Sequence, residues 1–246
     1  MKDKKKARLS DFPKIECPFI RQTFKVDREQ WKKYGRKIGL REPKVYLVVN
    51  RINPGYEWVL EDEDTFATEK LNGTNIKIQT ENGRLTCVQN RLNVIDPLQI
   101  IKGKTFIIES IFQSIGKGYV QPDGIQAGEG IGPKIQGNPY KLNVHLWYPF
   151  SKAIKDLRYR SFHEHERNFE NWSSWFKDFL VSRFFIKRDS KLKLDEKVMA
   201  EGVVFYNLRR KEEGKPYMAK LRRDMFDWYY GDKIEIFDYD INGRDE

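Results

Sequence analysis

Residues 68–77 read TEKLNGTNIK, and they place one lysine, Lys70, at a corner between two expected β-strands. Residues alternate with a period of two from Ile76 to Gln89, on either side of Glu81-Asn82-Gly83, and an Asn-Gly pair is the strongest short hairpin signal. We therefore expect Lys70 at the mouth of a β-hairpin. A lysine amine is a nucleophile only where neighbouring cations or partial burial lower its pKa from about 10.4. A Glu-Lys pair before a turn also fits an ordinary solvated surface.

Composition limits the class of protein. The 246 residues suit one large domain or at most two modest ones, and we favour one. A net charge of +10 fits a polyphosphate partner such as RNA or DNA, although it also fits simple solubility. The two cysteines form no Cys-x-x-Cys pair, which argues against a thiolate metal site or a disulfide framework and favours a reducing, cytoplasmic setting. No apolar run approaches the roughly 20 residues that cross a bilayer, so we expect a protein without a membrane partner.

The N-terminal quarter predicts a tail followed by short elements. Residues 1–10 are rich in lysine and predict a basic disordered tail or a nucleic-acid arm, and the domain is expected over 11–246. A short strand and a short helix capped near Asp27 follow, then a buried strand over 44–52. Another strand is expected to begin at Trp58 and Leu60, before an acidic loop that leads to Lys70.

The middle of the chain mixes helical and turn signals. Asp96-Pro97 predicts a helix start, with helical spacing up to Gly116 in which Glu109 reads as an exposed residue. Glycine-rich residues 125–133 and 136–139 predict two turns around one carboxylate, Glu129. Alternation over 142–150 predicts a strand buried on both faces. Aromatic residues at helical spacing predict a basic and aromatic insertion of one or two amphipathic helices at about 151–197. His163 and His165 read as surface residues, because the three histidines lack a metal-binding spacing.

Two strands close the pattern. Glu201 leads an expected strand, and a second over 217–223 places Lys220 and Arg222 on one face. Two cations on one face can clamp a phosphate and lower the pKa of a nearby lysine. The same pair also fits an edge strand kept soluble by charge.

The order of these motifs is informative: Glu-Lys-x-Asn-Gly-Thr-Asn, an arginine, Gly-Glu among glycines, Glu-Gly-Val-Val, then Lys-x-Arg. This order resembles the covalent nucleotidyltransferase superfamily of polynucleotide ligases and capping enzymes, most closely the RNA ligase 2-like branch of ATP-dependent RNA ligases. The resemblance spans Glu69 to Arg222. It implies an α+β nucleotidyltransferase (ATP-grasp-like adenylation) domain with antiparallel sheets flanked by helices.

The resemblance also implies roles for residues of this chain. Lys70 would form a lysyl-AMP, and Lys220 and Arg222 would assist it. The nucleotide-binding positions would be Glu69, Asn72, Gly73, Arg91, Glu129, Glu201 and Lys220, with Tyr148 or Trp147 stacked on adenine. Arg91 would contact the nucleotide and the RNA end, Glu129 would hold the ribose, and Glu201 would help to place Mg²⁺ or Mn²⁺. The chain departs from the pattern at Arg222, where lysine is usual and an acid role is in doubt because arginine keeps its proton.

The resemblance thus implies an RNA-repair ligase that uses ATP and a divalent metal to join an RNA 5′-phosphate to a 3′-hydroxyl. Only 24 residues follow Arg222, so we expect no C-terminal OB barrel, and a protein partner or second copy could present the RNA ends. Two alternatives stay open. One is a DNA ligase or capping-type enzyme, against which Thr74-Asn75 argues, and the other is a non-catalytic RNA-binding protein with a ligase-like fold.

Overall fold

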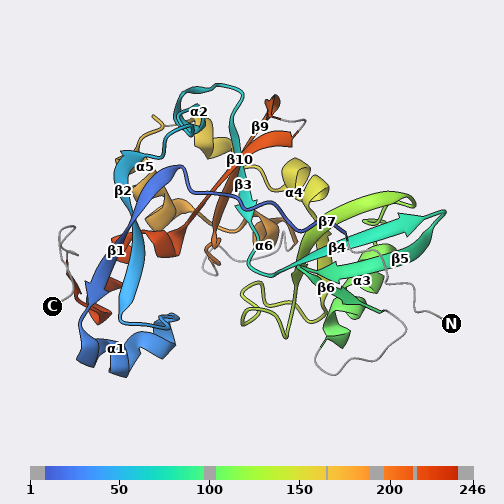
Figure 1. Cartoon of the computed structure of the whole chain (residues 1–246), viewed down its shortest axis with the longest axis horizontal. Coiled ribbons are helices and arrows are strands. Elements are labelled where there is room, and N and C mark those ends of the chain that lie inside the picture. The colour runs from blue at the N-terminus through green and yellow to red at the C-terminus, as the bar shows by residue number, and fades with distance from the viewer. Residues whose placement is uncertain (1–8, 97–103, 165, 189–196, 213–214, 238–246) are drawn as a thin grey trace. The chain divides into compact units, whose positions relative to one another are not determined.

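The computed structural model describes residues 9–96, 104–164, 166–188, 197–212 and 215–237 (Figure 1). The chain divides into two compact units, one of Met1–Lys14, Leu71–Arg158 and Val181–Ala200, the other of Ile15–Lys70, Tyr159–Leu180 and Glu201–Glu246. The expectation of one domain stays a prediction, because compactness does not tell whether each unit folds alone. Every described strand pair is antiparallel, as expected. Among the described residues, no helix is both long and apolar enough to span a bilayer.

The unit that begins at Leu71 contains a five-stranded sheet in the order β6-β5-β4-β7-β8. Its elements are β4 (Thr74–Glu81), β5 (Arg84–Asn90), β6 (Asn93–Ile95), α3 (Thr105–Gly116), β7 (Gly124–Ile131), β8 (Leu146–Pro149), α4 (Phe150–Asp156) and α6 (Arg183–Arg188). The predicted hairpin is confirmed, with Asn82 and Gly83 at φ values of 49° and 73° between β4 and β5. Helix α3 covers one face of the sheet, where Ile76, Ile78 and Trp147 pack against Ile107 and Ile111 (Figure 1).

The other unit contains two three-stranded sheets, β11-β1-β2 and β10-β9-β3. Its elements are β1 (Phe19–Val26), α1 (Arg28–Tyr34), β2 (Lys44–Ile52), α2 (Trp58–Glu61), β3 (Phe66–Lys70), α5 (Phe169–Ser174), β9 (Gly202–Glu212), β10 (Lys215–Arg222) and β11 (Ile236–Phe237), with a π-helix at Trp175–Phe179. The predicted cap is confirmed, since the Asp27 side chain accepts a hydrogen bond from the Gln30 N–H. Three short 3-10 helices and β11 make up the described chain after Arg222.

Several local predictions were wrong for identifiable reasons. The expected strand at Trp58 and Leu60 is the helix α2, in which the adjacent residues Trp58 and Val59 are both buried. The glycines of 124–131 lie in strand β7 and not in turns. At Gly128 a Cβ would meet the Tyr148 carbonyl oxygen and the Trp147 indole, and at Gly130 it would meet the Ile76 side chain, so close packing explains these two glycines. The strand expected over 142–150 is only β8, although all four of its residues are buried.

Helix boundaries also differ from those predicted. Helix α3 begins at Thr105, and Pro97 of the expected Asp96-Pro97 start lies outside the described residues. The segment 151–197 forms several short helices and contributes to both units. Several of its aromatic residues belong to the cores of the two units: Phe162 and Trp172 pack on Phe205 of β9, and Phe184 packs on Tyr148 of β8. Of the expected tail, residues 1–8 lie outside the described part, whereas the Leu9 carbonyl accepts a hydrogen bond from Gln89.

Candidate functional site

Lys70 lies at the end of strand β3, in the β10-β9-β3 sheet. It is paired in register with Gly202 of β9, and Gly202 is paired with Arg222 of β10. One row further along the same face, Thr68 faces Val204, which faces Lys220. Residues aligned across a sheet, and those two apart along a strand, point to the same side. The prediction that Lys220 and Arg222 share a face is therefore confirmed, and Lys70 shares that face with them.

A carboxylate lies within this group of cations. Lys70 Nζ is 2.6 Å from Glu201 Oε2, and Arg222 Nη1 is 3.7 Å from Glu201 Oε1. The Lys70 and Glu201 side chains are only 24% and 19% exposed, so their ion pair is partly shielded from water. The backbone carbonyl of Glu201 also accepts a hydrogen bond of 2.9 Å from the Arg223 N–H. We call Lys70, Glu201, Lys220 and Arg222 the lysine cluster.

Gly202 sets the spacing of the lysine cluster. A Cβ at this position would lie 2.2 Å from the Leu221 carbonyl oxygen and 2.7 Å from Arg222 Cα, which real Cβ atoms essentially never do. Both neighbours are backbone, so neither can rotate away. The sequence Glu201-Gly202 therefore allows β10 to approach β9 closely where Lys70 and Arg222 flank the glycine.

Lys220 is the lysine with a lowered pKa. Burial is the largest cause, followed by the positive charges of Lys70 and then of Arg222. Glu16 opposes this shift and Arg21 adds to it, so both lie near enough to act on Lys220. Sequence reasoning missed these two residues, because nothing in the local pattern around Glu16 and Arg21 indicates Lys220, which lies far along the chain, as a neighbour.

The carboxylates near the lysine cluster bear on whether it could hold a metal ion. Among the described residues, no group of three or more His, Cys, Asp or Glu side chains could enclose a metal. Two carboxylates do flank Arg222, since Arg222 Nε is also 3.1 Å from Asp224 Oδ1. Mg²⁺ is commonly bound by one or two carboxylates together with substrate phosphates and waters. The residues present therefore fit a metal that arrives with a phosphate ligand.

A second group of expected site residues lies in the other unit, around Glu129. Asn75, Glu129 and Tyr148 are aligned across β4, β7 and β8, so they share the face opposite α3. The Glu129 side chain is buried and accepts a hydrogen bond of 2.5 Å from Asn75 Nδ2. Asn75 was not among the predicted site residues. It lies two residues from Lys77, on the same face of the hairpin, and this spacing could have indicated it. A buried carboxylate held by an amide is suited to accept hydrogen bonds from a polar ligand.

The turn before β4 packs directly against Glu129. A Cβ on Gly73 would lie 2.2 Å from the Gly130 carbonyl oxygen and 2.7 Å from Glu129 Cγ, so only glycine fits. The preceding residue, Asn72, donates its backbone N–H to the Tyr140 hydroxyl at 2.7 Å. Local packing thus fixes both of the expected binding positions in this turn.

The two aromatic candidates occupy opposite faces of the sheet. Trp147 is fully buried beneath α3, and its indole N–H donates to the Ile76 carbonyl at 3.1 Å. Tyr148 lies on the Glu129 side, where its ring packs edge-on against Phe184 and its hydroxyl donates to Asp156 Oδ2 at 3.0 Å. Both side chains are therefore buried, but only Tyr148 shares a face with Glu129.

Asp156 receives three donors in this region. Burial alone would raise its pKa, but the contacts from Lys152, Lys187 and Tyr148 outweigh burial and lower the pKa to about 2. The two lysine nitrogens lie 2.8 and 2.9 Å from its carboxylate oxygens. This ion-pair network fixes the Tyr148 hydroxyl.

Two further predicted residues lie apart from these groups. Glu69 is buried and aligned with Val203, so it points to the face of β3 opposite Lys70. Arg91 is exposed in the turn between β5 and β6, with a left-handed φ of 52°. Glu109 is an exposed helix residue as expected, and its carboxylate is 2.8 Å from His145 Nδ1. His163 is exposed as expected, and His165 lies outside the described residues.

Comparisons with known proteins give a distant likeness. No family model and no curated protein matches the chain. The chain is similar to solved structures of Naegleria gruberi RNA ligase. A variant of that ligase with ATP and Mn gives 19% identity and a TM-score of 0.41, with 68% of this chain and 51% of that chain covered. An apo variant gives 16% identity and a TM-score of 0.41, with 87% of this chain and 61% of that chain covered. A third variant, with ATP and Mn, gives 18% identity and a TM-score of 0.38, with 64% of this chain and 49% of that chain covered. The chain thus spans about half to three fifths of that ligase.

Proposed function

We propose that this protein is an ATP-dependent RNA ligase that acts through a lysyl-AMP on Lys70. The observation that carries this proposal is the lysine cluster, in which a partly shielded lysine shares one sheet face with two further cations and lies 2.6 Å from a carboxylate. Catalysis of transfer at phosphorus depends mainly on a positioned nucleophile and on cations that stabilise the phosphate charge. We choose ATP as the nucleotide and RNA as the nucleic acid because the order of the sequence motifs resembles that of ATP-dependent RNA ligases.

In the first step, the neutral Lys70 amine attacks the α-phosphate of ATP. A nitrogen–phosphorus bond forms, the bond from the α-phosphate to the bridging oxygen breaks, and pyrophosphate leaves. Glu201 Oε2 lies within hydrogen-bond distance of Lys70 Nζ and can accept the ammonium proton. Lys220 and Arg222, on the same face, would stabilise the negative charge of the phosphate oxygens.

The next two steps transfer and release AMP. The RNA 5′-phosphate attacks the lysyl-AMP, so the Lys70–phosphorus bond breaks as an anhydride forms. A 3′-hydroxyl then attacks the activated 5′-phosphate, and AMP leaves as the phosphodiester forms. Glu201 and Asp224 would hold Mg²⁺ or Mn²⁺, which when bound neutralises charge on phosphate oxygens. Arg222 cannot act as an acid in any of these steps.

We further propose nucleotide-binding roles for the residues around Glu129. Glu129 would accept hydrogen bonds from the ribose, beside Asn72 and Gly73. Of the two aromatic candidates for adenine we choose Tyr148, because it shares a face of the sheet with Glu129 whereas Trp147 lies on the α3 side. Arg91 would contact the nucleotide and the RNA end from its exposed turn, and Glu69 would support the strand that carries Lys70.

The test is covalent labelling of the purified protein with α-labelled ATP and Mg²⁺. We expect acid-labile, base-stable label on the wild type and none on Lys70→Ala or Lys70→Arg. Arginine retains a positive charge beside Glu201 but cannot lose its proton to become the nucleophile. A variant of an exposed lysine, Lys32→Ala, serves as the matched control and should label like the wild type.

Failure to label would overturn the proposal, provided that the protein is folded, is free of bound AMP and has been offered ATP, GTP and NAD. Label from GTP alone would instead identify a capping-type enzyme. If ATP labels Lys70, the sealing of a nick in duplex RNA but not in duplex DNA would establish the RNA substrate.

A further inference from the structure

The outer face of the β11-β1-β2 sheet is basic and aromatic. In register, Lys25 of β1 pairs with Lys44 of β2 and with Phe237 of β11. Tyr46 lies two residues from Lys44, and Arg21 lies four residues from Lys25, so alternation places all five side chains on one face. The opposite face carries Phe24, Val26, Val45, Leu47 and Ile236, which pack into the core of this unit. We call Arg21, Lys25, Lys44, Tyr46 and Phe237 the outer face.

Two aromatic rings on this face are open to solvent. Tyr46 is 42% exposed and Phe237 is 47% exposed, on the two strands that flank β1. Two strand spacings of about 4.8 Å and an offset of two residues along the strands put these positions roughly 12 Å apart. Single exposed rings are common on protein surfaces, so the significance of these two rests on the cations that accompany them.

The Tyr46 ring is held in place by its neighbours. Its hydroxyl donates to Glu42 Oε1 at 3.0 Å, while Arg21 Cζ and Lys44 Nζ lie 5.6 and 5.7 Å from the ring centroid. Glu42 is also 3.2 Å from Lys44, so this carboxylate positions both side chains. Because these contacts already restrict the ring, a base that stacks on it costs little further conformational freedom.

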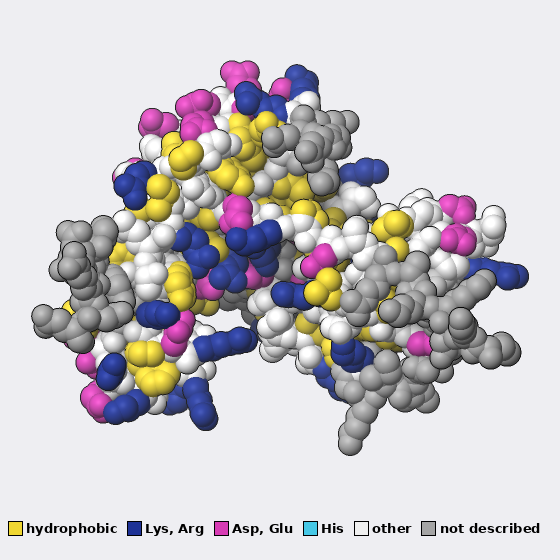
Figure 2. Space-filling view, viewed as in Figure 1, with side chains coloured by type: hydrophobic (Ala, Val, Ile, Leu, Met, Phe, Trp, Pro, Cys, Tyr) yellow, Lys and Arg dark blue, Asp and Glu magenta, His cyan; other side chains and the backbone are white. Residues whose placement is uncertain are grey.

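Positive charge is also dense in the segment that links β1 to β2. Residues 25–44 contain eight Lys or Arg and three Asp or Glu, which gives them a net charge of +5, half of the chain's +10. Lys25 and Lys44 lie on the outer face, whereas the other six cations belong to α1 and the residues after it, whose Tyr34, Ile38 and Leu40 pack on the opposite face of the sheet. In Figure 2, Lys and Arg side chains surround hydrophobic ones in the lower left of the view, over α1 and the adjoining ends of β1 and β2. Arg21, at the other end of the face, is one of the charges that act on Lys220 of the lysine cluster. The outer face therefore begins near the lysine cluster in the same unit.

We propose that the outer face binds a single strand of RNA. Its phosphates would contact Arg21, Lys25 and Lys44, and its bases would stack on Tyr46 and Phe237. Cations combined with exposed aromatic rings are the usual means of binding single-stranded nucleic acid without sequence preference. The inference rests on the proposed function, because it assigns a surface to the RNA that the ligase would join.

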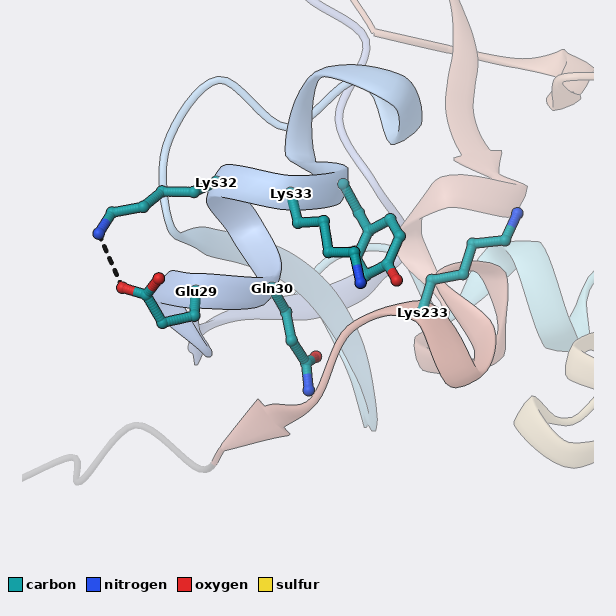
Figure 3. Close-up of a pocket in the computed structure, with 6 residues that line it drawn as sticks. Glu29, Gln30, Lys32, Lys33 and Lys233 are labelled. Carbon is teal, nitrogen blue, oxygen red and sulfur yellow. Dashed lines mark hydrogen bonds and ion pairs between the residues drawn. The ribbon is translucent and has the colours of Figure 1, made fainter.

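A second basic surface in this unit supplies the control. An open pocket beside α1 is lined by Glu29, Gln30, Lys32, Lys33, Tyr34 and Lys233 (Figure 3). Lys32 is already paired with Glu29 at 2.7 Å, and Lys33 Nζ lies 5.0 Å from the centroid of the half-buried Tyr34 ring. This pocket has positive charge but no ring as exposed as those of the outer face.

The first measurement is the binding of a fluorescent 20-nucleotide single-stranded RNA by anisotropy, without ATP. Replacement Tyr46→Ala should weaken binding roughly 5- to 150-fold, the range that base stacking on an aromatic ring spans. Tyr46→Phe retains the ring and should bind within about 2-fold of the wild type. Wild-type binding by Tyr46→Ala would overturn the proposal, and the exposed position of Tyr46 makes unfolding a poor explanation for loss.

The second measurement is the salt dependence of the same binding. The double variant Lys25→Ala/Lys44→Ala should make the slope of log K against log salt shallower by about 1.4, at about 0.7 for each phosphate that a lysine no longer neutralises. The control Lys32→Ala/Lys33→Ala removes the same charge and should leave the slope unchanged. Equal changes in both variants would show a general charge effect and would overturn the proposal. So would equal displacement of the RNA by polyglutamate, which would indicate an acidic-protein partner.

Labelling with ATP separates this proposal from the proposed function. The outer-face variants should still form the lysyl-AMP, because Tyr46, Lys25 and Lys44 lie outside the lysine cluster. Loss of RNA binding with labelling retained supports both proposals. RNA binding that depends on Tyr46 in a protein that never labels would support the outer face and overturn only the ligase.

Discussion

Replacement Asp156→Asn should destabilise the protein in a manner that depends on pH. The Asp156 side chain is 18% exposed and receives Lys152, Lys187 and the Tyr148 hydroxyl. Its pKa in the folded protein is about 2, against 3.8 as the ordinary value. A folded pKa below the unfolded one means that the carboxylate stabilises the fold above pH 4 and that this stabilisation is lost as the pH falls towards 2.

The difference in pKa sets the magnitude. At pH 7 the carboxylate should contribute about 2 kcal/mol to the free energy of unfolding, falling to about 1 kcal/mol at pH 3 and to about 0.4 kcal/mol at pH 2. Asparagine resembles the protonated acid, so the variant should be less stable by these amounts at each pH. Urea unfolding of both proteins at pH 7, 4, 3 and 2 measures the difference.

The matched control is a change at an exposed carboxylate. Glu81→Gln, an exposed change in the same unit, should alter the free energy of unfolding by less than about 0.5 kcal/mol at any of these pH values. A stability difference for Asp156→Asn that stays constant from pH 7 to pH 2 would refute the argument, because the effect would then come from shape and not from charge.

Three further changes test the packing and charge described above. Gly202→Ala should abolish most ATP labelling of Lys70, because the Cβ would meet a backbone oxygen at 2.2 Å and push β10 away from β9; normal labelling would contradict this. Gly128→Ala would place a Cβ 2.5 Å from a β8 carbonyl and should lower the free energy of unfolding by about 1–3 kcal/mol in thermal melts, whereas Gly116→Ala, with open space around it, should not. NMR titration of methylated lysines should find the pKa of Lys220 below 10.5 and higher in Lys70→Ala, since a positive neighbour is removed; an unchanged pKa would argue against the cluster.

The sequence predicted the elements whose signals are local. The Asn82-Gly83 hairpin, the Asp27 cap and the strand over 44–52 all depend on residues within a few positions of one another. The face shared by Lys220 and Arg222 also follows from alternation within one strand. These features were predictable because the backbone, and not distant contacts, determines them.

Long-range packing decided the features that the sequence did not predict. Trp58 and Leu60 alternate like a strand, yet the segment folds as α2, with Trp58 and its neighbour Val59 both buried. No local pattern relates Arg21 to Lys220, or reveals that Trp147 packs in the cluster beneath α3 while Tyr148 packs in the cluster on the opposite face. These outcomes depend on sheet order and register, which join residues far apart in sequence.

The glycines show both the local backbone preference and the long-range packing. Taken as sequence, a glycine-rich stretch around Glu129 predicts turns, because glycine adopts backbone angles that turns require. In the structure, Gly128 instead leaves room beside the Trp147 indole, and Gly73 lies against Glu129. Gly202 serves the same purpose between the strands of the lysine cluster. Close approach of backbones, rather than turning of the chain, therefore explains why glycines accompany the carboxylates of both candidate groups.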